Sequence, residues 1–172
     1  MWRIDKMIST KLHWIPAHAP GKLAISARPR GGDWLEEEMF AWQALGINVV
    51  VSLLEPDEQN DLDLAAEGDV ARMYGLNFIS LPIPDRGIPS YRTKPQALLS
   101  DLRHLVQSGQ SIVIHCRQGV GRAGMVAASL LTSFGFEPED AIEAVSAARG
   151  VPVPETREQR DWIQSASTYR VA

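Results

Sequence analysis

The sequence contains a single cysteine, Cys116, and this scarcity excludes several kinds of site. One cysteine cannot form a disulfide within the chain, and a metal site would have to use the four histidines and carboxylates instead. In a reducing compartment, a lone cysteine is more interesting as a nucleophile than as a structural cross-link.

The sequence also lacks long hydrophobic runs and a strong excess of charge. Its longest apolar runs, such as Val49–Val51, are far shorter than the roughly 20 residues that a membrane-spanning helix needs. The segment Met1–Lys6 has no apolar region typical of secretory signals, so we expect a soluble cytoplasmic protein without a membrane partner. The net charge of −4 gives no sign of a basic face, so we expect no nucleic-acid partner.

The size and composition are those of an ordinary globular protein. At 172 residues the chain is long enough for one well-buried core and short for two domains. Hydrophobic residues make up 45% of it and charged residues 22%. The sequence has no internal repeat, low-complexity tract or linker-like stretch, so we expect residues 1–172 to form a single domain.

Segments typical of strands alternate with segments of helical periodicity. Strands are expected over Lys22–Ala27, Asn48–Leu53, Asn77–Ile83 and Ser111–His115; helices from Asp33 to Gly46, within Pro56–Tyr74 after a turn or short helix, from Thr93 onward, and over Arg122–Phe134, Glu137–Arg149 and Glu155–Tyr169. This alternation predicts an α/β fold with a mainly parallel central sheet of about four or five strands, flanked by helices. In such sheets ligands bind beyond the carboxyl ends of the strands, where the loop after His115 lies and the loop after Ile83 is a candidate.

Two helix starts carry the pattern of a capping box, in which a cap residue is followed three positions later by Glu or Gln. We expect one such box at Asp33 and Glu36, and a second at Thr93 and Gln96. Each helix would bury one apolar face. The inward residues expected are Leu35, Met39, Trp42 and Leu45 in the first helix, and Leu98, Leu99, Leu102, Leu105 and Val106 in the second.

The loop between the last expected strand and the buried helix has the most specific pattern in the sequence. It reads His115-Cys116-Arg117-Gln118-Gly119-Val120-Gly121-Arg122. Its glycines let the backbone curl so that successive amides point inward, and the following helix start adds unpaired N–H groups and a positive dipole end. Such a loop favours a thiolate at Cys116 and binds an oxyanion, which the planar fork of Arg122 can hold by two oxygens.

The alternative interpretation of this loop is a buried structural cysteine in a glycine-containing turn. A chance match to its spaced His, Cys, Gly and Arg in a chain of this length is about a 10⁻⁴ event at average residue frequencies. Its position between an apolar strand and an apolar helix is a further condition that chance must meet. The pattern therefore favours chemistry at Cys116.

Residues 115–122 resemble the signature of the protein tyrosine phosphatase superfamily, and their Cys-Arg-x-Gly form is similar to its dual-specificity members. Two further segments, residues 82–89 and 151–156, resemble the kinase-associated phosphatase type, so the likeness covers roughly residues 22–162. The resemblance implies a phosphatase fold and a two-step reaction: phosphoryl transfer to Cys116, then hydrolysis of the thiophosphate. We therefore expect neither a metal ion nor another cofactor. It also implies that residues 117–122 (Arg117, Gln118, Gly119, Val120, Gly121 and Arg122) bind the substrate phosphate and that His115 supports the thiolate.

The resemblance also implies a general acid on a loop upstream of the cysteine, and Asp85 occupies that position. A positioned carboxylic acid can protonate the leaving oxygen as the phosphate ester breaks. On its residues alone, Asp85 equally fits a turn residue after proline. Asp101 and Asp57 are weaker candidates because both fit the surface of a helix.

Three other residues either allow two interpretations or depart from the family pattern. Arg117 would contact substrate or pair with a carboxylate. Gln159 resembles a glutamine that positions water in some relatives, but with Thr156 it also fits a capping box, which we favour. Most relatives carry Ser or Thr after the signature arginine, whereas this chain has Ala123. We therefore predict slow hydrolysis of the phosphoenzyme and a pre-steady-state burst.

The leading hypothesis is a phosphoprotein phosphatase that acts on phosphotyrosine, with phosphoserine and phosphothreonine left open as further substrates. One alternative keeps the chemistry and changes the substrate to a phosphoinositide, a sugar phosphate or an RNA 5′-phosphate. Another is a non-enzymatic phosphate-binding module, although binding alone needs no nucleophile. A rhodanese-type sulfurtransferase also uses a cysteine loop, but it needs neither Arg122 nor Asp85.

Overall fold

The structure is a computed structural model that describes residues 9–168, and its centre is a five-stranded sheet. The strands lie in the order β1-β2-β5-β3-β4, with bounds His13–Ile15, Leu23–Ser26, Val49–Ser52, Asn77–Ser80 and Ile112–His115 for β1 to β5. Four of them run parallel, and β1 pairs antiparallel to β2 at one edge. The predicted mainly parallel sheet is therefore confirmed, and β1 is a strand that the sequence did not indicate.

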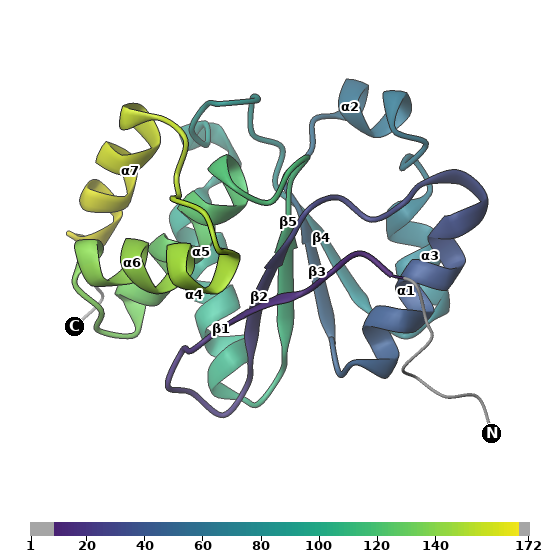
Figure 1. Cartoon of the computed structure of the whole chain (residues 1–172), viewed down its shortest axis with the longest axis horizontal. Coiled ribbons are helices and arrows are strands. Elements are labelled where there is room, and N and C mark those ends of the chain that lie inside the picture. The colour runs from purple at the N-terminus through teal and green to yellow at the C-terminus, as the bar shows by residue number, and fades with distance from the viewer. Residues whose placement is uncertain (1–8, 169–172) are drawn as a thin grey trace.

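Helices cover both faces of this sheet (Figure 1). Their bounds are Leu35–Ala44 for α1, Pro56–Asp61 for α2, Glu67–Met73 for α3, Pro95–Gln107 for α4, Gly121–Ser133 for α5, Pro138–Arg149 for α6 and Arg157–Ser167 for α7. Helices α1 and α3 lie on one side, and α4 to α7 lie on the other. None of the helices within residues 9–168 is long and apolar enough to span a membrane.

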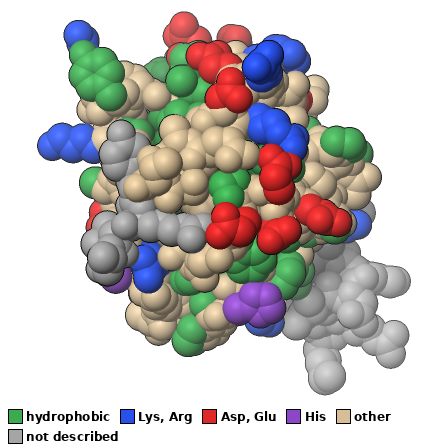
Figure 2. Space-filling view, turned by 90° about the vertical axis from the view of Figure 1, so that its left-hand side faces the viewer, with side chains coloured by type: hydrophobic (Ala, Val, Ile, Leu, Met, Phe, Trp, Pro, Cys, Tyr) green, Lys and Arg blue, Asp and Glu red, His purple; other side chains and the backbone are tan. Residues whose placement is uncertain are grey.

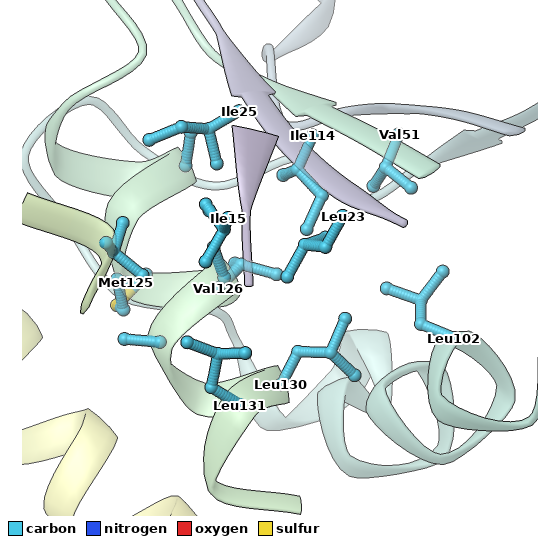
Figure 3. Packing of buried hydrophobic residues seen from close by; sticks show 14 of the residues in the cluster. Ile15, Leu23, Ile25, Val51, Leu102, Ile114, Met125, Val126, Leu130 and Leu131 are labelled. Atoms are coloured by element: carbon cyan, nitrogen blue, oxygen red, sulfur yellow. The ribbon is translucent and has the colours of Figure 1, made fainter. Parts of the chain in front are cut away.

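The strands are apolar on both faces because each face meets a separate hydrophobic core. Val49 and Val51 of β3 pack in the larger core, whereas Val50 between them belongs to the core under α1 and α3. Figure 3 shows the larger core, in which side chains of the strands, such as Leu23 and Ile114, lie on the side facing those of α5, such as Leu130. Helix α5 is buried along nearly its whole length, as predicted for a central helix.

Two of the predicted helix starts are wrong in their capping. At the first helix, a 3₁₀ turn over Gly32–Trp34 comes before α1, so the N-cap is Trp34 and no side chain caps the helix. At the second, Thr93 ends another 3₁₀ turn, and the N-cap of α4 is Lys94 in the left-handed conformation. In both cases the expected cap residue belongs to a short 3₁₀ turn, and the N-cap of the helix lies one residue later.

Smaller differences concern the ends and faces of helices. Leu45 was expected to face inward, but it follows the last residue of α1 and is 45% exposed. The acidic segment after β3 forms two separate helices, α2 and α3, in agreement with a short helix before a longer one. The last helix ends at Ser167, and its expected end at Tyr169 and the segment Met1–Lys6 lie outside the described residues.

The outer helices present an ordinary charged surface. Figure 2 shows the face that carries α6 and α7, where acidic and basic side chains are interspersed and hydrophobic side chains form only small separate patches. The loops after β3, β4 and β5 instead gather at the upper edge of the sheet in Figure 1. Since these are the carboxyl ends of parallel strands, the fold brings the loops after His115 and Ile83 to the same edge.

Candidate active site

The turn formed by residues 116–122, called here the cysteine turn, begins directly after β5 and runs into α5. At its centre Gly119 has a φ of +70°, and a Cβ there would lie 2.5 Å from the carbonyl carbon of Ser26. A side chain at this position would therefore be both strained and blocked by backbone. This glycine lets the turn curl back over the cysteine, and the Gly119 N–H donates a hydrogen bond to the sulfur, with 3.3 Å between the two atoms.

Carbonyl groups of the cysteine turn point outward, where other elements hold them. Arg149 donates to the carbonyl oxygens of Gln118 and Gly119 at 3.2 and 3.1 Å, and the Arg28 N–H donates to the carbonyl oxygen of Arg117 at 3.3 Å. In a trans peptide the N–H points opposite to the carbonyl, so the following amides face the inside of the turn. The turn therefore directs the N–H groups of residues 118–120 toward its inside, which agrees with the sequence prediction.

Arg122 lies in the first turn of α5 and is almost fully buried, with 2% of its side chain exposed. Its two terminal nitrogens donate to the carboxylate of Glu58 at 2.7 and 2.9 Å, and one also donates to the carbonyl oxygen of Ile83 at 3.0 Å. Burial by itself lowers the pKa of Arg122, but the bonds to Glu58 and the nearby Cys116 and Asp85 raise it overall. The guanidinium therefore remains charged and fixed in orientation.

Glu58 is a site residue that reasoning from the sequence missed. Its carboxylate accepts both hydrogen bonds from Arg122, and these bonds hold its pKa below the ordinary value despite the opposing effect of burial. The same carboxylate accepts the N–H of Glu55, which closes a capping box at the start of α2. The available signal was this box, a Glu three residues after a cap position with Pro56 between them.

The acid turn, residues 84–87, carries Asp85 at the edge of the site. The Gly87 N–H donates to the Pro84 carbonyl oxygen at 2.8 Å, and Arg86 adopts a positive φ of +59°. Asp85 is 64% exposed, yet one carboxylate oxygen lies 3.3 Å from a terminal nitrogen of Arg122. A phosphate bound by Arg122 would therefore be a close neighbour of the Asp85 carboxyl group.

His115 is fully buried behind the site and does not line it. Its Nε2 lies 2.7 Å from Oε1 of Glu67, and its Nδ1 lies 3.4 Å from the carbonyl oxygen of Cys116. Glu67 is also buried and has one carboxylate oxygen without a hydrogen-bond partner. This pair fixes the imidazole against the backbone of the cysteine and gives His115 the supporting position expected of it.

A small pocket of about 130 Å³ lies in the mouth of the cysteine turn. Its lining residues are Asp85, Arg86, Cys116, Arg117, Gln118, Gly121, Arg122 and Glu155. The structure thus brings the predicted nucleophile, arginine and acid together. Of the predicted phosphate-binding residues, Gly119 and Val120 are not part of the lining: Gly119 donates to the sulfur, and the Val120 side chain packs against the larger core.

Two further residues, Arg117 and Glu155, lie at the pocket. Arg117 reaches within 4.0 Å of Glu58, the carboxylate pairing that was one of its two expected uses, while it also lines the pocket. Glu155 lines the pocket as well and was not predicted to do so. Within residues 9–168, no cluster of three or more His, Cys, Asp and Glu side chains is placed to hold a metal ion.

Gln159 forms the predicted capping box with Thr156, and its side chain is fully buried. The Gln159 N–H donates to the Thr156 hydroxyl at 3.1 Å, and its amide oxygen accepts the N–H groups of Glu155 and Thr156 at 3.1 and 3.3 Å. Its amide nitrogen donates to the carbonyl oxygen of Gly87 at 3.1 Å. The capping interpretation of Gln159 is confirmed.

Comparisons with known proteins agree with this geometry. Residues 10–168 match a family described as "Swiss Army Knife protein, DSP-PTPase phosphatase domain". Cyclin-dependent kinase inhibitor 3 of Sus scrofa is 31% identical over 97 residues, which are 55% of this chain and 45% of that protein. The chain thus spans less than half the length of this curated relative.

Two solved structures are similar over most of the chain. Tk-PTP in its active form is 28% identical, with a TM-score of 0.70 over 87% of this chain and 93% of that one. Kinase associated phosphatase (KAP), with its catalytic-site cysteine replaced by serine, gives a TM-score of 0.81 over 93% of this chain and 95% of that one. The latter is 19% identical and therefore shows the fold alone.

Proposed function

The chain belongs to the DSP-PTPase family of phosphatase domains, and we propose that it hydrolyses phosphate monoesters of phosphoproteins through a cysteinyl-phosphate intermediate. The observation that carries this proposal is the convergence of Cys116, Arg122 and Asp85 on one pocket. A nucleophile, an oxyanion-binding group and a proton donor are the parts that this reaction requires.

In the first step, the Cys116 thiolate attacks the phosphorus and the bond to the leaving oxygen breaks. The inward N–H groups of the cysteine turn and the start of α5 stabilise the negative charge on both the sulfur and the phosphate oxygens. Arg122 has five N–H groups, of which Glu58 and Ile83 take three, so others can bind phosphate oxygens. Asp85 donates its proton to the leaving oxygen.

In the second step, water attacks the phosphorus of the cysteinyl phosphate and the sulfur–phosphorus bond breaks. The Asp85 carboxylate takes one proton from the water, so the acid of the first step is restored. The electron pair of the broken bond returns to Cys116 as the thiolate, and inorganic phosphate leaves. Arg122 and the amides of the turn keep their contacts through both steps, because the charge that they stabilise stays in the same place.

The charges around the pocket favour a phosphoprotein over a phosphate ester that bears several phosphates. Arg117 lies near Glu58, and the carboxylates of Glu155 and Asp85 also line the pocket. These acidic groups offset the positive field that a polyanion such as a phosphoinositide needs. A panel of phosphotyrosine, phosphoserine and phosphothreonine peptides against phosphoinositides discriminates the two substrate classes, and preference for the lipids overturns this assignment.

The chemistry itself is tested by comparing the protein with its Cys116→Ser variant on p-nitrophenyl phosphate. A serine hydroxyl is a far weaker nucleophile than a thiolate, so we expect the variant to lose nearly all turnover. Vanadate binding measured by calorimetry should persist, since the amides and Arg122 remain. Equal hydrolysis rates would reject cysteine catalysis. The proposal requires a free thiol, and therefore a reducing compartment such as the cytoplasm.

A further inference from the structure

We propose that Gln159 is a positioning residue that holds the acid turn in place beside the cysteine turn. The inference rests on the proposed function, because it takes Asp85 as the proton donor. It concerns the amide nitrogen of Gln159, which the capping of α7 does not use. Gln159 therefore has two separable functions, one for each end of its amide.

The amide of Gln159 connects three parts of the site. Its oxygen accepts the N–H groups of Glu155 and Thr156, which fixes the loop before α7. Its nitrogen donates to the carbonyl oxygen of Gly87, the last residue of the acid turn. A Cβ at Gly121 would lie 3.2 Å from the amide oxygen, so the side chain also packs against the end of the cysteine turn.

The acid turn needs such a contact because it projects from the fold. Both Asp85 and Arg86 are 64% exposed, and the hydrogen bond from Gly87 to Pro84 closes the turn upon itself. Arg122 holds the near side of the turn, where it donates to the Ile83 carbonyl oxygen and lies 3.3 Å from Asp85, while Gln159 holds the far side at Gly87. The ion pair of Arg86 with Glu155 is long, at 3.8 Å, and open to solvent, so it adds little. The bond from Gln159 is buried at its donor end and fixes the backbone two residues after Asp85.

Proton transfer to the leaving oxygen is sensitive to small displacements of the acid. A loosened acid turn would therefore slow substrates whose leaving oxygen needs a proton, while substrates with an acidic leaving group would react nearly as before. This dependence on the leaving group separates positioning of Asp85 from a general structural role. A damaged fold slows both kinds of substrate alike.

The experiment compares kcat/KM for phenyl phosphate, whose phenol is a poor leaving group, with that for dinitrophenyl phosphate, whose phenol leaves as the anion. This parameter covers the steps up to phosphoryl transfer, so slow hydrolysis of the phosphoenzyme does not obscure it. Gln159→Glu keeps an oxygen for the capping box and loses the donor to Gly87. Its added charge acts alike on both phosphate dianions, and the neutral variant Gln159→Met controls for an effect of the charge on Asp85.

The matched control is Thr156→Ala, which removes the capping hydroxyl and leaves the amide of Gln159 intact. It should lower the melting temperature and leave the ratio of the two substrates unchanged. Gln159→Glu should lower kcat/KM for phenyl phosphate by roughly tenfold, a part of the 10²–10⁴-fold that general acid catalysis contributes, and change dinitrophenyl phosphate hydrolysis little. If the buried carboxylate prevents folding, Gln159→Met removes the donor without a charge and should give the same result.

Asp85→Asn is the reference variant that separates the role of Asp85 as the acid from the positioning of that acid by Gln159. If it changes the ratio strongly and both Gln159 variants leave it unchanged, Gln159 does not position the acid, while the proposed function stands. A ratio that Thr156→Ala shifts as much as Gln159→Glu would also overturn the inference. An unchanged ratio in Asp85→Asn rejects the acid assignment, and the positioning of that acid with it.

Discussion

Cys116 and Arg122 have 3% and 2% of their surface exposed, whereas Asp85, which lines the same pocket, is 64% exposed. The cysteine turn is held by Arg149, by Arg28 and by the close backbone of β2, all from distant parts of the chain. The acid turn is held by the amide of Gln159 at Gly87 and by ion pairs of Asp85 and Arg86, two side chains that are mostly exposed. Electrostatic stabilisation needs groups that are enclosed and fixed before the reaction, while a proton donor must be reachable by the leaving group of each substrate, so the two turns differ as their proposed roles require.

The largest effect on activity is expected at Arg122, a buried residue of the cysteine turn. Arg122→Lys keeps a positive charge but cannot form the fork that holds a phosphate by two oxygens, so kcat/KM should fall by about 10³-fold. The measurement is steady-state hydrolysis of p-nitrophenyl phosphate, with the melting temperature as a check that the variant folds. Activity within about tenfold of the original protein would mean that the guanidinium is not the main oxyanion-binding group.

A change at Asp85, in the exposed acid turn, should lower activity without lowering stability. Asp85→Asn should lower kcat/KM for phenyl phosphate by about 10²-fold, because the leaving oxygen loses its proton donor. Hydrolysis of dinitrophenyl phosphate, whose phenol leaves as the anion, should change little. The melting temperature should stay the same, since the side chain is mostly exposed. An equal loss of kcat/KM on both substrates would contradict the role of Asp85.

The Glu58→Gln variant tests how much the charge of Glu58, paired with Arg122, contributes to the stability of the fold. Arg122 holds the pKa of Glu58 below its ordinary value of 4.5, so this pair stabilises the fold above that pH, and the contribution is lost as acid protonates Glu58. Glu58→Gln should lower the unfolding free energy near neutral pH by about 2 kcal/mol, because Arg122 is left buried without its carboxylate.

Urea unfolding of both proteins at neutral and acidic pH provides the measurement for Glu58. Their difference in unfolding free energy should shrink when the pH falls below the depressed pKa of the carboxyl group, since both proteins then carry a neutral side chain at position 58. A constant difference across the pH range would show that the pair stabilises through hydrogen-bond geometry alone.

The sequence predicted the parts of the site whose signals are local. The strand, the glycine-containing turn and the apolar helix around Cys116 are contiguous, and each agrees with its neighbours, so their arrangement could be predicted. The loop that carries Asp85 could be placed because proline and glycine end the preceding strand at a known edge of the sheet, whereas the choice of Asp85 as the acid came from the family resemblance. Most of the parallel sheet followed from the alternation of strands and helices in the same way.

The residues that were missed make contacts across long stretches of sequence. Glu58 meets Arg122 over 64 positions and Glu67 meets His115 over 48, and both are ordinary acidic residues of helices in the sequence alone. The capping predictions at Asp33 and Thr93 failed for the opposite reason, because a short 3₁₀ turn overrides a local pattern that is otherwise correct. The same pattern succeeded at Thr156, where no such turn intervenes.

The smallest expected effect concerns Ala123, which is fully buried in the same core as Cys116 and belongs to the rigid side of the comparison. A hydroxyl there could hydrogen-bond the departing thiolate in the second step, a contribution of at most about 1.5 kcal/mol, so Ala123→Ser should raise turnover by up to about tenfold. Rapid-quench measurements should show a burst of product in the original protein and a smaller burst in the variant, because only hydrolysis of the phosphoenzyme is accelerated. If neither protein shows a burst and turnover does not rise, the second step is not rate-limiting, and the rigid turn stabilises the departing sulfur sufficiently through the Gly119 N–H.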